Sequence, residues 1–284
     1  MVEITAAAVK SLRDRTGAGM MDCKRALLEV GGDEERAIDL LRQRGAAKAA
    51  KRAGRSATEG AVRLAAGEGG AALVELSSET DFVARNQEFL DLGDRLAAFA
   101  VAADLADGEI VDGEALLGAA GAEGLRTELE DLRSRIGENV ELRRCVRYAG
   151  AAGRTLGSYV HFGNRIGVIV ELAGPADASP DADLAREVAM HVAAANPVGV
   201  SPDDIPEEER ERERSVLTEQ TRAEGKPEPI VERIVEGRMR KFYEQSTLLM
   251  QSFVKDPDVT IADLLARQGD DLTVSRFVRF EIGT

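Results

Sequence analysis

The first fifty residues carry apolar positions at helical spacing in three short groups. Thr5 precedes the first group and Asp33 precedes the third, and both residue types are favoured at helix N-caps. Pairs of glycines separate the groups. The apolar positions are, in chain order, Ala8, Val9 and Leu12, then Cys23, Ala26, Leu27 and Val30, then Ala37, Ile38 and Leu41. We therefore predict a small three-helix domain over roughly the first 44 residues, with a basic, alanine-rich tail and linker to residue 55.

After residue 55 the helical spacing is replaced by short apolar segments, which are typical of β-strands. Residues 60–64 and 71–76, joined by a glycine-rich turn, predict one β-hairpin, and residues 157–161 and 166–172 predict another. An amphipathic helix is predicted after each hairpin. The apolar stripes of these helices are Phe89, Leu90, Leu96 and Phe99 in the first, and Leu184, Val188, His191 and Val192 in the second.

A third strand is predicted at the end of each of these units. Residues 142–148 match residues 274–280 in an Arg-x-Val-Arg-aromatic pattern, which indicates an internal duplication. The repeats run over residues 56–149 and 150–284. We therefore predict an α+β fold, in which a three-helix domain precedes two similar halves packed side by side.

A charged insertion lies within the second repeat, over residues 202–250. Residues 206–224 are densely charged, residues 225–229 predict a turn, and residues 230–242 carry an apolar helical stripe. This pattern predicts a projecting helical hairpin, or short coiled coil. Val216 and Leu217 are the apolar seam positions of its first arm, so we expect thin packing and mobility there.

Composition and charge narrow the classes of partner. The chain has 284 residues and a net charge of −14, which argues against binding to the phosphate backbone of nucleic acids and favours protein partners. No apolar run approaches the ~20 residues that a membrane span needs. Because the N-terminus lacks the pattern of a signal peptide, we expect a cytoplasmic protein. The two cysteines, Cys23 and Cys145, lie in apolar patterns and are interpreted as core thiols.

Motifs for catalysis are scarce. The sequence contains no P-loop, dinucleotide fingerprint, HExxH or CxxC, so we predict neither a metal site nor a cofactor. Glu79 and Asp81 are a conceivable acid–base pair, but no nucleophile or oxyanion donor accompanies them. The two histidines, His161 and His191, are interpreted as packed or surface residues. We expect that the protein is not an enzyme.

Two longer motifs carry a resemblance to a known family. Residues 12–27 (LRDRTGAGMMDCKRAL) and residues 75–86 (ELSSETDFVARN) look like the two signatures of the bacterial elongation factor Ts family. Supporting matches follow in the family's order at residues 135–139, 157–161, 165–168, 190–194, 225–227 and 235–239. Longer members of the family continue with a C-terminal helical module, so we expect the contacts of that module to be absent or replaced.

The resemblance implies a guanine-nucleotide exchange factor for elongation factor Tu, the GTPase that delivers aminoacyl-tRNA to the ribosome. In the family the segment matching Thr80 to Val83 enters the GTPase near its nucleotide and dislodges Mg²⁺. Asp81 would hydrogen-bond the displaced segment of the partner, and the ring of Phe82 would wedge between helices. The N-terminal piece resembles ubiquitin-associated domains and docks on the GTP-binding domain. Further contact positions implied by the family are Arg13, Met20, Met21, Lys24, Ile136, Gly137 and His161.

Several alternatives remain open on the residues alone. Met20 and Met21 follow a glycine turn, where flexible thioethers suit an adaptable contact surface, or else one of the two fills the small core. Asp81 can cap the following helix rather than face a partner. A protein-interaction scaffold that is insensitive to nucleotide is the alternative function.

Overall fold

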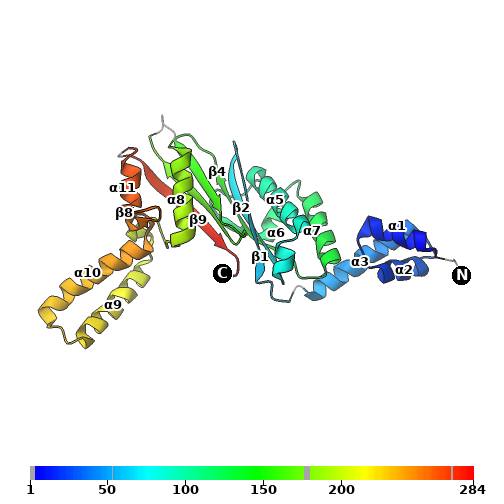
Figure 1. Ribbon diagram of the computed structural model, residues 1–284, viewed down its shortest axis with the longest axis horizontal. Helices are drawn as coiled ribbons and strands as arrows, with labels where there is room; N and C mark the ends of the chain where they lie inside the picture. The colour runs from blue at the N-terminus through cyan, green and yellow to red at the C-terminus, as the bar shows by residue number, and fades with distance from the viewer. Residues whose placement is uncertain (1–3, 53, 176–179, 270) are drawn as a thin grey trace.

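The computed structural model describes residues 4–52, 54–175, 180–269 and 271–284. The molecule is elongated, with the N-terminal helices at one end, two β-sheets in the middle and a helical hairpin at the other end (Figure 1). This arrangement separates the three parts that the sequence distinguishes.

The N-terminal domain consists of three helices, as predicted. They are α1 (Ala6–Thr16), α2 (Met20–Glu29) and α3 (Glu34–Arg52). Thr5 caps α1, since its hydroxyl accepts a hydrogen bond of 3.2 Å from the amide of Ala8. Gly17 ends α1 with a φ of 66°, a left-handed conformation that favours glycine. Cys23 is buried in the core of this domain. The helix α3 extends through the basic, alanine-rich tail to Arg52, as the prediction of a helical tail there expects, and it packs against α7 (Glu123–Ile136) of the first repeat.

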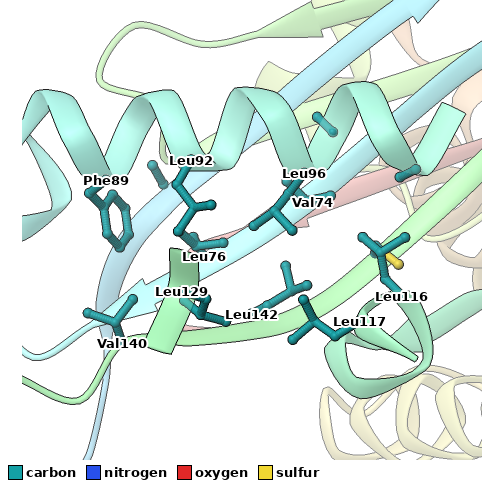
Figure 2. Packing of buried hydrophobic residues seen from close by; sticks show 14 of the residues in the cluster. Val74, Leu76, Phe89, Leu92, Leu96, Leu116, Leu117, Leu129, Val140 and Leu142 are labelled. Carbon is teal, nitrogen blue, oxygen red and sulfur yellow. The ribbon is translucent and has the colours of Figure 1, made fainter. Parts of the chain in front are cut away.

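The first repeat folds into a sheet covered on one face by helices. Its strands are β1 (Glu59–Gly67), β2 (Gly70–Ser78), β3 (Ile110–Asp112) and β4 (Glu141–Ala149), in the spatial order β1-β2-β4-β3 with antiparallel pairing. Its helices are α4 (Asp81–Ala84), α5 (Gln87–Ala102), α6 (Gly113–Leu117) and α7 (Glu123–Ile136). Figure 2 shows Phe89, Leu92 and Leu96 of α5 packing toward Val74 and Leu76 of β2. The predicted hairpin and amphipathic helix are therefore confirmed, whereas β3, α6 and α7 were not predicted.

The second repeat has the same central topology. Its strands β5 (Arg154–Val160), β6 (Ile166–Ala173) and β9 (Thr273–Glu281) pair antiparallel in the order β5-β6-β9, and α8 (Ala182–Ala195) packs on them. Short elements flank the helical hairpin of the insertion. The 3-10 helix η1 (Pro202–Asp204) precedes the hairpin, and it is followed by η2 (Leu248–Met250), β7 (Ser252–Phe253), β8 (Asp256–Thr260) and α11 (Ile261–Ala266). The pairing of β2 with β4 and of β6 with β9 shifts register at the same place, between Glu75 and Leu76 in one and between Glu171 and Leu172 in the other, so that the last strand of each repeat carries a bulge. This shared irregularity supports the duplication read from the sequence.

The two sheets pack face to face, a closer arrangement than the side-by-side placement we expected. Leu73 and Tyr148 of the first sheet share a buried cluster with Ile169 and Phe280 of the second. A Cβ atom on Gly167 would lie 2.5 Å from Cγ1 of Val62, so only glycine fits this approach of the sheets. The layers therefore run helix, sheet, sheet, helix.

Arginines cross between the sheets. The Arg144 guanidinium of β4 lies 4.4 Å from the ring centre of Phe280 in β9, and the Arg276 guanidinium of β9 lies 4.3 Å from the ring centre of Tyr148 in β4. Each last strand thus stacks its arginine on the aromatic residue of the other last strand. Such cation–π contacts are stronger when they are shielded from water.

A fully buried glutamate accompanies each of these arginines. Glu75 accepts from Arg144 at 2.6 Å, and Glu171 accepts from Arg276 at 2.9 Å. Burial raises the pKa of Glu171, but hydrogen bonds from Arg276 and Ser275 outweigh it, so its pKa lies below the ordinary value. The buried carboxylate of Glu171 is therefore charged and paired at neutral pH.

The insertion forms an antiparallel helical hairpin of α9 (Glu207–Ala223) and α10 (Glu228–Ser246), as predicted. Val231, Val235 and Met239 of α10 form its buried seam, and Leu217 of α9 packs against them. The prediction that Val216 also lies in the seam was wrong, because Val216 is 41% exposed and faces solvent. Thr221 is buried instead, with its hydroxyl bonded at 2.7 Å to the carbonyl of Leu217. The first arm, α9, therefore contributes few apolar side chains to its contact with α10.

Candidate partner-binding site

The segment of the stronger sequence motif forms a short, braced tip at the end of β2. Thr80 is the N-cap of α4, and its hydroxyl accepts a hydrogen bond of 3.4 Å from the amide of Val83. Ser78 donates its hydroxyl to the carbonyl of Thr80 at 3.0 Å. A strand therefore passes directly into one helical turn, with little freedom between them.

Two adjacent residues of this tip point in opposite directions. The side chain of Phe82 is 83% exposed, whereas Val83 is 8% exposed and packs into the core of the first repeat. Val83 was predicted to contact the partner, and the structure places it inside its own domain. Its burial anchors α4, so that the ring of Phe82 is held away from the surface of the protein.

The two acidic residues of the motif have separate partners. Asp81 forms an ion pair of 3.1 Å with Arg85, one helical turn later, and its side chain is about half exposed. Glu79 accepts a hydrogen bond of 2.6 Å from the amide of Asn139. The cap of α4 is Thr80, so Asp81 is not needed for that role. The carboxylates of Glu79 and Asp81 do not form a paired acid–base site.

Ile136 and Gly137 lie beside the tip, at the C-terminal end of α7. Gly137 adopts a φ of 80° and ends the helix. The next residue, Glu138, accepts hydrogen bonds from both the amide and the hydroxyl of Thr80, at 3.1 and 2.7 Å. The structure thus brings together two predicted contact segments that are more than fifty positions apart in sequence.

The turn between β5 and β6 reaches the same end of the sandwich. His161 lies at its start, and its Nδ1 is 3.0 Å from the hydroxyl of Tyr159. The amide of Val62 donates to the carbonyl of Asn164 at 2.7 Å, which fastens this turn to β1 close to where β1 pairs with the end of β2. Phe162 at the turn is 96% exposed, more than Phe82.

Phe162 was not among the predicted site residues. The signal that could have identified it is an aromatic residue followed by Gly-Asn in a predicted hairpin turn, where a large apolar side chain has no strand partner to cover it.

The predicted contact residues of the N-terminal domain lie on helices outside the first repeat. Arg13, Met20, Met21 and Lys24 are all exposed on α1 and α2. The turn between these helices approaches the end of α7, since a Cβ atom on Gly17 would lie 2.4 Å from Cδ of Arg135. The prediction that one methionine fills the core was wrong. Met20 and Met21 are 55% and 59% exposed, because α2 begins at Met20 and its buried face starts only at Cys23.

The described residues offer little else for catalysis. They contain no group of three or more His, Cys, Asp or Glu side chains placed to hold a metal ion. Cys145 is buried and its pKa is raised to about 12, because burial disfavours the thiolate. In the part of the chain that the structure covers, no helix has both the length and the apolar character for a membrane crossing.

Comparison with known proteins identifies the family. A family model described as "Elongation factor TS" matches residues 79–284. Proteins named "Elongation factor Ts" are similar over nearly the whole chain. The one from Alkalilimnicola ehrlichii is 48% identical over 282 residues, covering 99% of this chain and 92% of its own. Those from Halorhodospira halophila and Rhodospirillum rubrum are 46% and 47% identical, covering 99% and 100% of this chain and 93% and 94% of their own.

These matches define the class as that of bacterial translation elongation factors. Within it, the chain belongs to the elongation factor Ts family.

Proposed function

We propose that this protein is a guanine-nucleotide exchange factor for elongation factor Tu and that it acts in the cytoplasm. The observation that carries the proposal is the ring of Phe82, 83% exposed on a tip that is anchored from inside by Val83. An apolar ring held in water by a rigid support is costly for an isolated protein and useful for one that inserts it into a partner. Family membership supports the choice of partner.

In the proposed mechanism, the tip enters the GTPase beside its nucleotide and displaces Mg²⁺. Asp81 exchanges its surface ion pair with Arg85 for a hydrogen bond to the displaced segment of the partner, at little cost because such exposed pairs contribute ~0–1 kcal/mol. Phe82 wedges between helices of the partner. Loss of Mg²⁺ then leaves the phosphate charges without their counter-ion and weakens nucleotide binding.

The wedge cannot account for exchange by itself. The factor weakens nucleotide binding by the same ratio by which nucleotide weakens binding of the factor. A ~10⁴-fold effect requires about 5.5 kcal/mol of differential binding, whereas burial of one Phe is worth about 1.5–3 kcal/mol. Removal of Mg²⁺ and the remaining contacts must supply the difference. We assign these contacts to Ile136, Gly137 and His161 near the tip.

The N-terminal domain is assigned to docking. Its exposed residues Arg13, Met20, Met21 and Lys24 belong to α1 and α2 and not to the tip, so they can hold the GTPase while the tip reaches the nucleotide site. The protein needs no cofactor in this mechanism, because the nucleotide and Mg²⁺ belong to the partner. No covalent bond is made or broken, and we therefore propose a binding protein rather than an enzyme.

Release of a fluorescent GDP analogue from elongation factor Tu, followed by stopped flow, tests the proposal. We expect the unmodified protein to accelerate release, and the Phe82→Ala variant to bind the GTPase but release nucleotide more slowly. Ile110→Ala removes an apolar side chain that is 51% exposed on β3 of the same repeat, and it should leave the rate unchanged.

An unchanged rate for Phe82→Ala would contradict the role of the ring. If the unmodified protein instead bound the GTPase equally well with and without GDP, it would be a nucleotide-insensitive scaffold, the alternative function.

A further inference from the structure

We propose that Glu79 and Glu138 are positioning residues for exchange, which together clasp the tip and hold Phe82 at the angle from which it enters the partner. This inference rests on the proposed function and deepens it. Neither glutamate belongs to the contact positions that the family implies, and neither needs to touch the GTPase.

The clasp is reciprocal. The carboxylate of Glu138 accepts from the amide and the hydroxyl of Thr80, at 3.1 and 2.7 Å. The carboxylate of Glu79 accepts from the amide of Asn139 at 2.6 Å. Each glutamate therefore binds the backbone amide of the residue that follows the other glutamate. These hydrogen bonds join the segment that follows β2 to the segment that follows α7.

The linker from the N-terminal domain joins the same unit. The side-chain amide of Asn139 donates to the carbonyl of Arg55 at 2.9 Å, and the guanidinium of Arg55 lies 3.5 Å from Glu79. The charge of Arg55 offsets the repulsion between the two nearby carboxylates. The linker, the tip and the end of α7 thus meet at one place.

The position of the clasp indicates a role beyond stability. All four of its residues, Glu79, Thr80, Glu138 and Asn139, are only partly buried. At such a surface, water would satisfy their amides without carboxylates. The core beneath is also closed by Phe89 and Val140, which lie outside the clasp and outside α4. Its effect falls on α4, a helix of four residues that is too short to be stable by itself.

A fixed tip reduces the entropy lost on binding. If Thr80 were free, α4 would fray, and part of the binding energy would be spent on ordering the tip in the partner. That energy would no longer weaken nucleotide binding. Loss of the clasp should therefore slow nucleotide release at saturating factor, while the concentration for half saturation, set largely by docking of the N-terminal domain, stays the same.

Glu138→Gln is the primary variant. The amide keeps one acceptor oxygen, so only one of the two hydrogen bonds to Thr80 survives. We expect the limiting rate of GDP release to fall about 3–10-fold, the effect of losing one typical hydrogen bond at a partly exposed site, with an unchanged half-saturating concentration. Glu141→Gln is the matched control, because it removes the same charge three positions later from an exposed side chain and should have no effect on the rate.

Variants of Thr80 separate positioning from general stability. Thr80→Val loses the hydroxyl that donates to Glu138 and should lower the limiting rate. Both changes act on the hydrogen bonds between Thr80 and Glu138. The double variant Glu138→Gln/Thr80→Val should therefore release GDP clearly faster than the product of the two single effects predicts. A merely structural role would instead lower the melting temperature and the active fraction without changing the limiting rate, which would overturn the proposal.

Amide hydrogen exchange in the free protein tests the clasp without the GTPase. In Glu138→Gln the amides of Thr80 and Val83 should exchange faster, while they should stay protected in Glu141→Gln. Unchanged exchange at these amides would overturn the clasp whatever the kinetics show. Failure of the unmodified protein to accelerate GDP release would instead overturn the proposed function, so the two failures are distinguishable.

Discussion

His191 is a titratable side chain that is fully buried and pairs on both nitrogens. It lies on α8, with Nε2 2.9 Å from the side-chain carbonyl of Gln251 and Nδ1 accepting from the amide of Val254 at 3.3 Å. Gln251 in turn donates to the carbonyl of Gln245 at the end of α10. Because Nδ1 accepts a hydrogen bond, the ring is neutral. Burial lowers the pKa of His191, against a smaller opposing effect of the hydrogen bond with Gln251.

Stability should therefore decline in mild acid. Below the ordinary histidine pKa of about 6.5 the unfolded chain takes up a proton that the folded chain does not, so the free energy of unfolding falls as pH falls from 7 toward 5. The paired carboxylates titrate at lower pH and do not mask this range. Urea unfolding at several pH values measures the slope.

The two histidines provide the comparison for this measurement. His191→Gln should flatten the slope, whereas His161→Gln, at an exposed position, should retain it. A slope that persists in His191→Gln would contradict the assignment.

For single residues, the sequence predicted a residue's role well where that role depends on its neighbours in the chain. The motif drew attention to Phe82, and the exposed ring is consistent with it. The opposite burial of Val83 and the clasp were not predictable, because they depend on the core and on Glu138, 58 positions from Thr80. The exposure of both methionines depends on where α2 begins, and helix boundaries are weakly encoded.

Among the elements, β5 and α8 approach each other backbone to backbone. A Cβ atom on Gly157 would lie 2.1 Å from the carbonyl carbon and oxygen of Ala185. These are backbone atoms of a helix, which cannot move aside as a side chain can. Gly157 therefore sets the distance between the helix and the sheet of the second repeat.

Gly157→Ala should lower the free energy of unfolding by about 1–3 kcal/mol, as overpacking does in well-packed cores. Gly237→Ala is the matched control, since Gly237 lies within α10 with open space around its Cα. That change should raise stability by up to about 1 kcal/mol, because alanine is the better helix former. Chemical denaturation measures both, and equal effects of the two variants would refute the steric argument.

The regular elements were predictable, and some of the misses had a signal. Both hairpins follow short apolar segments joined by turn residues, and their helices follow the 3.6-residue period that the sequence displays. The helix α7 also carries Leu125, Leu129 and Leu132 at helical spacing, so its pattern was present and overlooked. The strand β3 has three residues, none of them buried, and depends on pairing with β4.

Across the whole molecule, a charged network joins the two repeats. Glu171 of the second sheet is fully buried, and its partner Arg276 also binds Asp107 of the first repeat at 2.8 Å. Arg154 contributes a further contact to Glu171 at 2.8 Å. Removal of the carboxylate charge would leave two guanidinium groups without their common partner.

Glu171→Gln should therefore lower the free energy of unfolding by about 1.5–3 kcal/mol, the range for hydrogen bonds to a charged group. Glu187→Gln provides the contrast, because Glu187 pairs with Lys255 at the exposed surface, where a pair is worth less than ~1 kcal/mol. Denaturant unfolding measures the free energy of unfolding of both variants. A decrease in Glu187→Gln as large as in Glu171→Gln would contradict the prediction.

The face-to-face packing of the sheets could be anticipated only in part. The continuous apolar run of β2 indicates a strand that is covered on both faces, and every residue of β2 is indeed buried. The identity of the covering layer depends on the other repeat, which begins about eighty positions after β1. A sequence pattern reports that a face is apolar and does not report what lies on it.

The arginines that cross between the last strands make the two repeats sensitive to each other. Arg144 rests on Phe280 and Arg276 rests on Tyr148, so each repeat provides the aromatic face for a cation of the other. A substitution that removes one ring leaves the arginine of the other repeat with its buried glutamate but uncovers one side of that ion pair. A change in either half therefore alters the surroundings of a charged pair in the other half.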